Sequence, residues 1–288
     1  MKIVPSLIGI VTILRPTQWM KNLILFFPSF LGGELLGAGV LTRGVAPVVS
    51  FCLASSSTYI LNDIIDRESD RNHPRKSRRP IPSGGVSIAS ATILCLLCLA
   101  GSFILAYGIS SVFFSILVAY LFVSILYSLY LKNLPIVDLF CISAGFLFRL
   151  QAGGEAYRVE VSEWLFLSVF LLSIFLSTGK RLFEKNALGD AAVTHRRSLE
   201  SYPRGFLDGV MYMTGGAVLV TYTLYVIEHH VLIYTVPLCC FGLLRDMLRV
   251  RSGLGGDPTE SLLKDGPLLV IGVLWAVMVG WGIYGGRQ

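Results

Sequence analysis

Long apolar segments dominate this chain of 288 residues and restrict what it can fold into. Blocks of about 18 to 24 mostly apolar residues alternate with short polar clusters, and a helix of that length crosses a hydrocarbon layer about 30 Å thick. Hydrophobic residues make up 54% of the chain and charged residues only 15%, and the mean hydropathy is +0.69. A water-soluble domain could not bury that much apolar surface. The pattern therefore predicts an all-α, polytopic membrane protein.

The apolar blocks predict nine transmembrane helices in a single transmembrane domain that covers residues 1–288. The expected spans are residues 22–41, 44–61, 86–107, 109–131, 134–156, 162–178, 209–228, 231–248 and 267–285. Residues 1–21 contain a shorter apolar run that Pro5 interrupts. We therefore expect an N-terminal interfacial segment there rather than a tenth crossing.

The basic residues predict the orientation of these helices. Twenty of the 24 Lys and Arg residues lie before the first span or in the loops after spans two, four, six and eight, and three lie on the other side. Because Lys and Arg favour the cytoplasmic side, we expect a cytoplasmic N-terminus in a bacterial-type inner (plasma) membrane. The same bias explains the net charge of +6, so no nucleic acid is expected as a partner.

Carboxylates are concentrated on the same side, where topology gives no reason for them. Asp63, Asp66 and Asp70 stand at positions i, i+3 and i+7, which share one face of a helix. Three aligned negative charges repel one another unless a cation binds between them. Mg²⁺ prefers carboxylate oxygens and is often held jointly with substrate phosphates. We therefore predict that these three aspartates are catalytic metal ligands, and that the amide oxygen of Asn62 adds a further ligand.

A basic stretch follows the aspartates in the same loop, residues 62–85. It contains Lys76, Arg78 and Arg79, and Lys and Arg side chains are suited to binding phosphate. An acidic helix end followed by a basic loop predicts a diphosphate-binding site on the cytoplasmic side. The alternative is a topology-setting loop with incidental acids, but an aligned acidic triplet at a membrane boundary has no structural use.

These residues resemble the first motif of the UbiA-type intramembrane prenyltransferases, which handle diphosphate substrates with Mg²⁺. The similarity extends over nearly the whole chain, through residues 15–22, 62–84, 148–154, 179–184 and 197–202. Within the superfamily these stretches are most similar to the decaprenyl-phosphate phosphoribosyltransferases. The resemblance implies a nine-helix fold whose cytoplasmic polar loops cap an intramembrane cavity.

The resemblance also implies a reaction. It is the transfer of 5-phosphoribosyl from 5-phosphoribosyl 1-diphosphate to a polyprenyl phosphate lipid in the membrane bilayer, with release of diphosphate. The product would lead towards a lipid-linked ribose or arabinose donor for cell-envelope glycan. The acceptor phosphate is already an anion at neutral pH, so the reaction needs no strong general base.

Two further cytoplasmic loops, residues 179–208 and 249–266, are expected to complete the active site. In the second loop, Asp257 and Glu260 fit the N-cap and N3 positions of a helix start. The family's second acidic motif is altered here to these two acids and Asp265, which argues against a prenyl diphosphate as substrate. Capping alone, and capping together with a contact to metal or ribose, both remain open for this motif.

The end of the sixth span carries Lys180, Arg181 and Glu184. Lys180 and Glu184 have the spacing of an exposed helix salt bridge. The resemblance instead implies that Lys180 or Arg181 contacts a substrate phosphate, so all three residues are candidates for substrate binding.

Arg149 is the only basic residue that falls in the middle of an expected span. A charge in hydrocarbon needs a polar cavity or a partner, so Arg149 is a candidate for substrate binding. A structural pair with Asp138 or Glu155 is the alternative.

Four other polar residues at span ends are weaker candidates for substrate binding: Lys21, Asn22, Tyr127 and Lys132. The resemblance implies that Tyr127 and Lys132 lie near the diphosphate, and Lys21 and Asn22 lie at the mouth of the first span, where a lipid headgroup would approach. Interfacial anchoring is the alternative for these residues.

Two other functions remain open at this point. One is a UbiA-type prenyltransferase that moves an isoprenoid chain from its diphosphate to an aromatic acceptor. The other is a non-catalytic membrane transporter, although the sequence has no evident inverted repeat of broken helices. A homo-oligomer is compatible with the sequence.

Overall fold

The computed structural model describes residues 7–71, 76–188, 199, 201–228 and 230–285. Within these residues the secondary structure consists of helices joined by turns, without a strand. The all-α prediction is therefore confirmed for the described part of the chain. Parts of the predicted loops 62–85 and 179–208 lie outside the described residues.

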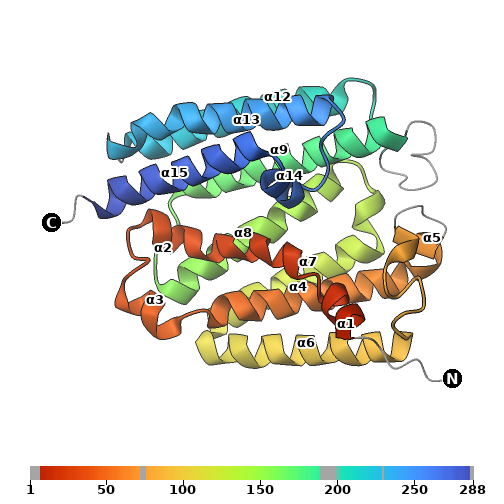
Figure 1. Ribbon diagram of the computed structural model, residues 1–288. Helices are drawn as coiled ribbons and strands as arrows, with labels where there is room; N and C mark the ends of the chain where they lie inside the picture. Colours follow the sequence, from red (N-terminus) through yellow and green to blue (C-terminus); the bar gives the residue numbers. More distant parts are fainter. Residues whose placement is uncertain (1–6, 72–75, 189–198, 200, 229, 286–288) are drawn as a thin grey trace.

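Eight long helices make up most of the fold (Figure 1). They are α4 (Ala46–Ile65), α6 (Ile88–Ile109), α7 (Ser111–Leu129), α8 (Val137–Tyr157), α9 (Glu163–Leu188), α12 (Phe206–Ile227), α13 (Val236–Arg251) and α15 (Gly266–Tyr284). The short helices are α1 (Leu7–Leu14), α2 (Phe27–Leu31), α3 (Ala38–Arg43), α5 (Arg67–Arg71) and α14 (Pro258–Lys264). The 3₁₀-helical segments of the described residues are η1 (Pro16–Phe26), η2 (Lys76–Arg78), η3 (Leu131–Asn133) and η5 (His230–Thr235).

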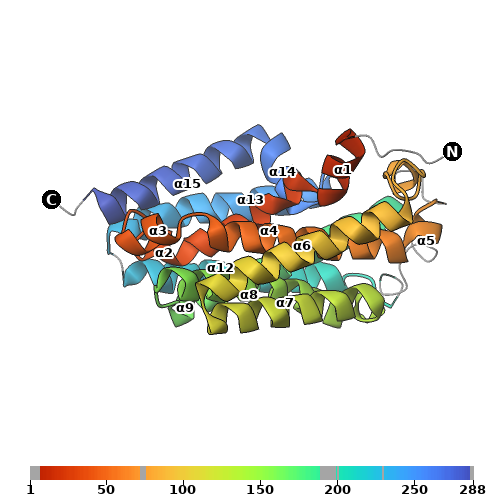
Figure 2. The same cartoon turned by 90° about the horizontal axis from the view of Figure 1, so that it is seen from below.

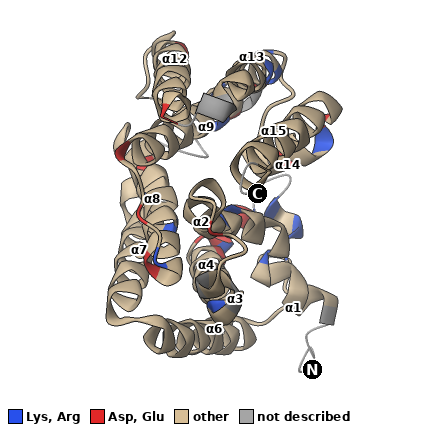
Figure 3. Cartoon of the chain, turned by 90° about the vertical axis from the view of Figure 1, so that its left-hand side faces the viewer, with Lys and Arg blue, Asp and Glu red and all other residues tan. Residues whose placement is uncertain are grey.

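The long helices lie side by side along one common direction (Figures 1 and 2). One group contains α4, α6, α7 and α8, and the other contains α9, α12, α13 and α15, with α8 packed against α9 between the groups. Figure 3 looks along this direction and shows α2 in the middle of the surrounding helices, whose ribbons are free of charged residues over long stretches. Helices α1 and α5 lie at one end of the bundle, and α15 ends at the other (Figures 1 and 2).

Six described helices are long and apolar enough to cross a membrane: α4, α6, α7, α9, α12 and α15. They correspond to six of the nine predicted spans, and their ends agree to within a few residues except at α9, which continues beyond residue 178. Helix α8 is not among these six, and its apolar character is lowered by Asp138, Arg149 and Glu155. Helix α13 falls short because it is only 16 residues long.

The prediction of one continuous helix over residues 22–41 is wrong. This region continues η1 as a 3₁₀-helix, forms the five-residue helix α2, turns, and then enters α3. Pro28 stands in the first turn of α2, where proline is tolerated. Gly33 then adopts a positive φ of 74°, which glycine accommodates without the steric penalty of a side chain. Two consecutive glycines therefore end α2 after little more than one turn.

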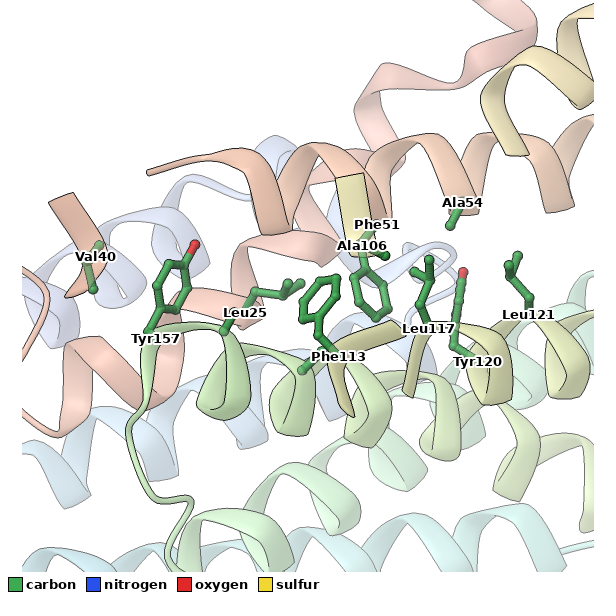
Figure 4. Packing of buried hydrophobic residues seen from close by; sticks show 12 residues of the cluster. Leu25, Val40, Phe51, Ala54, Ala106, Phe113, Leu117, Tyr120, Leu121 and Tyr157 are labelled. Atoms are coloured by element: carbon green, nitrogen blue, oxygen red, sulfur yellow. The ribbon is translucent and has the colours of Figure 1, made fainter. Parts of the chain in front are cut away.

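Aromatic packing joins α4 to α7. The rings of Phe51 and Phe113 meet edge to face with centroids 5.7 Å apart, and Tyr120 packs on Phe51 at 5.3 Å. Figure 4 shows these side chains pointing into the space between the helices together with Leu117 and Leu121. Buried aromatic pairs of this kind add to the stabilisation from apolar burial alone, so they fix the position of α4, whose last turn carries Asp63.

The central segment η1 approaches α8 closely at a glycine. A Cβ atom added at Gly153 would lie 2.1 Å from the backbone oxygen of Leu25, which is far inside the van der Waals distance. Small residues allow helices in membranes to approach in this way. Gly153 therefore sets the distance between α8 and the segment that leads into the site.

We expect Gly153→Ala to destabilise the protein by roughly 1–3 kcal/mol, because the new methyl group must displace backbone. Gly216→Ala on α12 is the matched control, since a Cβ there meets no heavy atom within 4 Å. The control should be neutral or more stable by up to about 1 kcal/mol, because alanine favours helix. Thermal unfolding in detergent measures both, and equal midpoints for the two variants would contradict this account of the close approach.

Candidate active site

Two of the three predicted aspartates lie together in the interior. Asp63 stands in the last turn of α4 and Asp70 in α5, and each is only 2% exposed. The prediction that all three aspartates line one continuous helix face is wrong. Helix α4 ends at Ile65, and Asp66 is its C-cap residue, after which α5 begins. The chain therefore turns between the first aspartate and the third.

A single guanidinium nitrogen links these two carboxylates. Arg79 Nη1 donates to Asp63 Oδ1 at 3.0 Å and to Asp70 Oδ2 at 2.8 Å. Arg15 Nη2 donates to the same Asp63 oxygen at 2.5 Å, and Lys76 Nζ lies 3.6 Å from Asp70 Oδ1. Three cations, one from the N-terminal segment and two from the loop at residues 76–79, thus offset the repulsion between two buried carboxylates.

Asp66 has a different partner. Lys132 Nζ, in η3, donates to both of its carboxylate oxygens at 2.7 and 2.9 Å.

Among the described residues, no group of three or more His, Cys, Asp and Glu side chains is arranged to hold a metal ion. Asn62 stands in the last turn of α4 and is partly exposed, and Arg78 is exposed.

A second charged cluster joins three segments. Asp257 Oδ2 lies 3.3 Å from Lys21 Nζ of η1 and 3.6 Å from Lys180 Nζ of α9. The other oxygen, Oδ1, accepts from the backbone of Thr259 at 3.0 Å, so the predicted N-cap of α14 is confirmed. Burial alone would raise the pKa of Asp257, but the two lysines outweigh it and hold the pKa below its usual value. One carboxylate therefore keeps two ammonium groups together.

The other two acids of this motif have structural partners. Asp265 caps α15 through the backbone of Leu268 and accepts hydrogen bonds from Arg245 and Arg249. The bond from Arg245 is the largest of the effects that hold the pKa of Asp265 well below its usual value. Glu260 forms an exposed pair with Lys264 one turn later. For these two acids, capping and pairing account for the side-chain contacts.

Arg149 is buried, and none of its hydrogen-bond partners within the described residues is a carboxylate. Its guanidinium donates to Asn22 Oδ1 at 2.6 Å, to the Gly145 carbonyl at 2.7 Å and to the Tyr120 hydroxyl at 2.9 Å, and it lies over the Tyr120 ring. Neither acid considered as its partner in the sequence pairs with it. Asp138 pairs with Arg181, and Glu155 accepts from a serine on α7. Arg149 and Asn22 thus form one polar contact within the bundle.

Arg181 and Asp138 form a buried pair at the centre of a hydrogen-bond network. Arg181 is 1% exposed and donates to Asp138 Oδ2 at 2.7 Å, while Asp138 itself is 0% exposed. The same guanidinium donates to Glu184 at 2.7 Å and to the Tyr127 hydroxyl at 3.1 Å. Glu184 therefore accepts from its i−3 neighbour Arg181, while Lys180 pairs at 3.6 Å with Asp257, the N-cap residue of α14.

Tyr202 completes this network. Its hydroxyl donates to Asp138 Oδ1 at 2.9 Å and accepts from the backbone of Ile136 at 2.6 Å. Ile136 has a φ of +67°, which is unfavourable for a β-branched residue. The Tyr202 hydroxyl thus secures a strained backbone at the start of α8.

Asp138 and Tyr202 escaped the sequence analysis as site candidates, and the pairing of Arg15 with Asp63 was not predicted either. Arg15 is 48 positions from Asp63 and Tyr202 is 64 positions from Asp138, so no helical periodicity links them. An arginine before a proline in an otherwise apolar N-terminal segment, and an aspartate at the start of an apolar span, were the available signals.

We expect Arg181→Met to cost about 3–5 kcal/mol of stability, because it leaves the Asp138 carboxylate buried without its cation. Lys264→Met removes the exposed pair with Glu260 and should cost at most about 1 kcal/mol. Thermal unfolding in detergent separates the two, and adding Asp138→Leu to Arg181→Met should recover part of the loss. An equal, small effect of both single substitutions would show that the buried pair has no special weight.

Comparison with known proteins places this geometry in a family. Residues 25–264 match the UbiA prenyltransferase family. The chain is 31% identical to the decaprenyl-phosphate phosphoribosyltransferase of Mycolicibacterium smegmatis, with 96% of this chain and 92% of that protein covered. It is 32% identical to the enzyme of the same name from Corynebacterium glutamicum, with 96% and 87% covered.

Solved structures agree on the fold. A UbiA homologue from Archaeoglobus fulgidus bound to GPP and Mg²⁺ superposes with a TM-score of 0.73 at 20% sequence identity, with 95% of this chain and 98% of that chain covered. The protein is therefore an enzyme that belongs to the UbiA prenyltransferase family.

Proposed function

We propose that this enzyme transfers the 5-phosphoribosyl group of 5-phosphoribosyl 1-diphosphate to a polyprenyl phosphate and releases diphosphate. The proposal is supported by relatives that carry the name decaprenyl-phosphate phosphoribosyltransferase and align with 96% of the chain. The observation that carries it in the structure is the acid pair Asp63–Asp70, which is surrounded by Arg15, Lys76 and Arg79.

The acid pair fits a divalent metal. Asp63 and Asp70 already share one cationic nitrogen, at 3.0 and 2.8 Å, so a metal ion could be shared in the same way. Hard carboxylate oxygens suit Mg²⁺, which is commonly held by one or two carboxylates and by substrate phosphates. The absence of a three-ligand group among the described residues agrees with a site that the substrate completes. The related structure with GPP and Mg²⁺ supports a divalent ion in this family.

In this proposal Asp63 and Asp70 hold Mg²⁺, and Asp66 and Asn62 stand next to them in the sequence as further oxygen donors. When bound, the metal neutralises charge on the diphosphate leaving group. Arg79 and Lys76, released from the carboxylates, bind the diphosphate oxygens, and Lys132 is placed by Asp66 for the same task. Arg78 adds an exposed positive charge to this side of the site.

The bond changes balance without an acid or base from the protein. An oxygen of the lipid phosphate forms the new bond to ribose C1, and the bond from C1 to the diphosphate oxygen breaks with its electron pair. The enzyme has to hold two anions close together and stabilise the charge that develops on the leaving group. Attack from the face opposite the diphosphate inverts the configuration at C1.

The altered motif at residues 257–265 favours a phosphate acceptor over a second metal site. Glu260 and Asp265 have pairs of their own, and Asp257 lies between Lys21 and Lys180. Asp257 of this loop therefore holds together two ammonium groups from η1 and α9, which suit an anionic acceptor. Because basic residues are concentrated at this end of the helices, we place the active site at the cytoplasmic face of the inner membrane, and the product would supply a lipid-linked pentose for cell-envelope glycan.

We expect Asp63→Asn and Asp70→Asn each to lower the Mg²⁺-dependent transfer of label from ribose-labelled 5-phosphoribosyl 1-diphosphate to polyprenyl phosphate. The loss should be about 10²–10³-fold or more, as for other charge-stabilising groups at a reacting centre. Glu68→Gln is the matched control, because its side chain is on α5 but is 74% exposed. The assay uses protein in lipid nanodiscs and measures label in the lipid extract.

The same preparation distinguishes the rival reaction. Prenyl diphosphate with an aromatic acceptor should give no prenylated product. Prenyl transfer in that arm, with no ribose label in lipid in the first arm, would overturn the proposal.

We also expect Arg79→Met to bind divalent metal more tightly in the absence of substrate, by roughly tenfold, because its guanidinium no longer competes for the acid pair. Mn²⁺ titration followed by electron paramagnetic resonance measures this affinity. Ribosyl transfer should nevertheless fall, because the diphosphate loses a cation. Arg71→Met, which removes an exposed pair with Glu68, is the control and should leave both quantities unchanged. Unaltered or weaker Mn²⁺ binding in Arg79→Met would contradict this competition.

A further inference from the structure

An apolar cavity lies in the half of the molecule that does not carry the acid pair. It has a volume of about 360 Å³ and is lined by α9, α12, α13, α14 and α15, with α2 on one side. Along α9 its lining runs from Leu165 to Leu176, a rise of about 16 Å at 1.5 Å per residue. The cavity is therefore long enough to enclose part of an extended hydrocarbon chain, and the chemistry proposed above makes no use of it.

Hydrogen bonds join the elements around the part of the cavity lined by α12 and α15. Trp275 Nε1 donates to the Tyr222 hydroxyl at 2.7 Å, and that hydroxyl shares a further hydrogen bond of 2.5 Å with Thr235. The Tyr225 hydroxyl donates to the Leu31 carbonyl at 3.4 Å. These bonds satisfy the ring N–H of Trp275 and the hydroxyl groups of the two tyrosines. Most of the remaining lining is apolar, and it includes one carboxyl group, that of Asp246 on α13.

The opposite part of the cavity reaches the lysine pair. Pro258 lines the cavity and directly follows Asp257, the residue that lies between Lys21 and Lys180. Leu176 also lines the cavity and stands one helical turn before Lys180 on α9. An apolar space thus begins beside two ammonium groups. This combination suits an amphiphile with a phosphate head and a hydrocarbon chain.

We infer that this cavity binds the first isoprene units of the acceptor lipid, with the lipid phosphate held between Lys21 and Lys180. The inference rests on the proposed function and deepens it. It assigns the acceptor to the half formed by α9, α12, α13 and α15, and the donor to the ends of α4 and α5. Without lipid, the Asp257 carboxylate lies where the two lysines converge and offsets their mutual repulsion. When the lipid binds, its phosphate replaces the Asp257 carboxylate and offsets the repulsion between the two lysines.

Glycines in the lining give a sharp test. Gly242 on α13 lines the cavity, and a Cβ added there meets no heavy atom within 4 Å. Gly242→Leu should therefore fill space that the lipid needs without displacing protein atoms, and leucine favours helix over glycine. Gly216→Leu on α12 is the matched control, because that position is equally open but does not line the cavity.

We expect Gly242→Leu to raise the KM for polyprenyl phosphate about tenfold and to leave the KM for 5-phosphoribosyl 1-diphosphate unchanged. Gly216→Leu should change neither. Equal KM values for the lipid in the two variants would overturn the inference, and so would a rise in the KM for the donor alone.

A second measurement does not depend on turnover. A polyprenyl phosphate that carries a diazirine on its first isoprene unit is photolysed with the protein in nanodiscs, and the labelled peptides are identified by mass spectrometry. Label should appear in α9, α12, α13 or α15, should decrease strongly in Lys180→Met, and should be displaced by unlabelled polyprenyl phosphate but not by the same concentration of inorganic phosphate.

The outcomes separate the two proposals. Label confined to bilayer-facing positions such as those of α6, or label unaffected by Lys180→Met, would overturn the lipid site even if ribose transfer is observed. Label in the cavity without any ribose transfer would leave the lipid site standing and defeat the proposed function. Displacement by inorganic phosphate alone would show a simple anion site that does not recognise the chain, which also contradicts the inference.

Discussion

The structure depends on the pairing of buried charges between segments that are distant in sequence. A charged side chain removed from water is strongly destabilising unless a partner of opposite sign and hydrogen bonds replace its solvent. Asp63 is paired with Arg15 and Arg79, and Asp138 with Arg181. Each pair therefore draws two or three elements together at the end of the bundle that carries α5, while apolar packing such as that of Phe51 and Phe113 holds the helices along their length.

These ionic contacts are of two kinds, and the difference separates structure from chemistry. Arg181 and Asp138 are both buried, and their hydrogen bonds are made to one another and to fixed neighbours. Arg79, in contrast, is partly exposed, and one of its nitrogens contacts two carboxylates. In the same way, Lys21 and Lys180 share one carboxylate oxygen. Shared, partly exposed partners can be exchanged for the charges of a metal–diphosphate or a phosphate. Fully enclosed pairs cannot be exchanged without a large loss of stability.

Much of the fold could be predicted from the sequence, because apolar length and helix-capping chemistry are local properties. The bounds of α4, α6, α7, α12 and α15 lie within a few residues of the expected spans, and the start of α14 at Asp257 follows from its capping residues. The first span was predicted wrongly because consecutive glycines break an apolar run that has the composition of a helix.

The candidate site was predictable by residue type but not by pairing. Lys180 and Arg181 are neighbours with the same charge, yet one faces Asp257 and the other is enclosed beside Asp138, because adjacent residues on a helix point about 100° apart. The same limit applies to Asp63, which pairs with Arg15 just before η1, and to Asp66, which pairs with Lys132 in η3. The spacing within a motif does not reveal a contact with a residue that is tens of positions away in the sequence.

The location of a divalent metal with the donor bound tests the central claim most directly. Crystals of the protein grown with Mn²⁺ and 5-phosphoribosyl 1-diphosphate would show the metal by its anomalous scattering. The account predicts a peak between the carboxylates of Asp63 and Asp70, with the diphosphate on it and the Arg79 guanidinium displaced towards the phosphates. A peak at the 257–265 loop instead, or donor bound with Arg79 still between the two aspartates and no metal there, would contradict it.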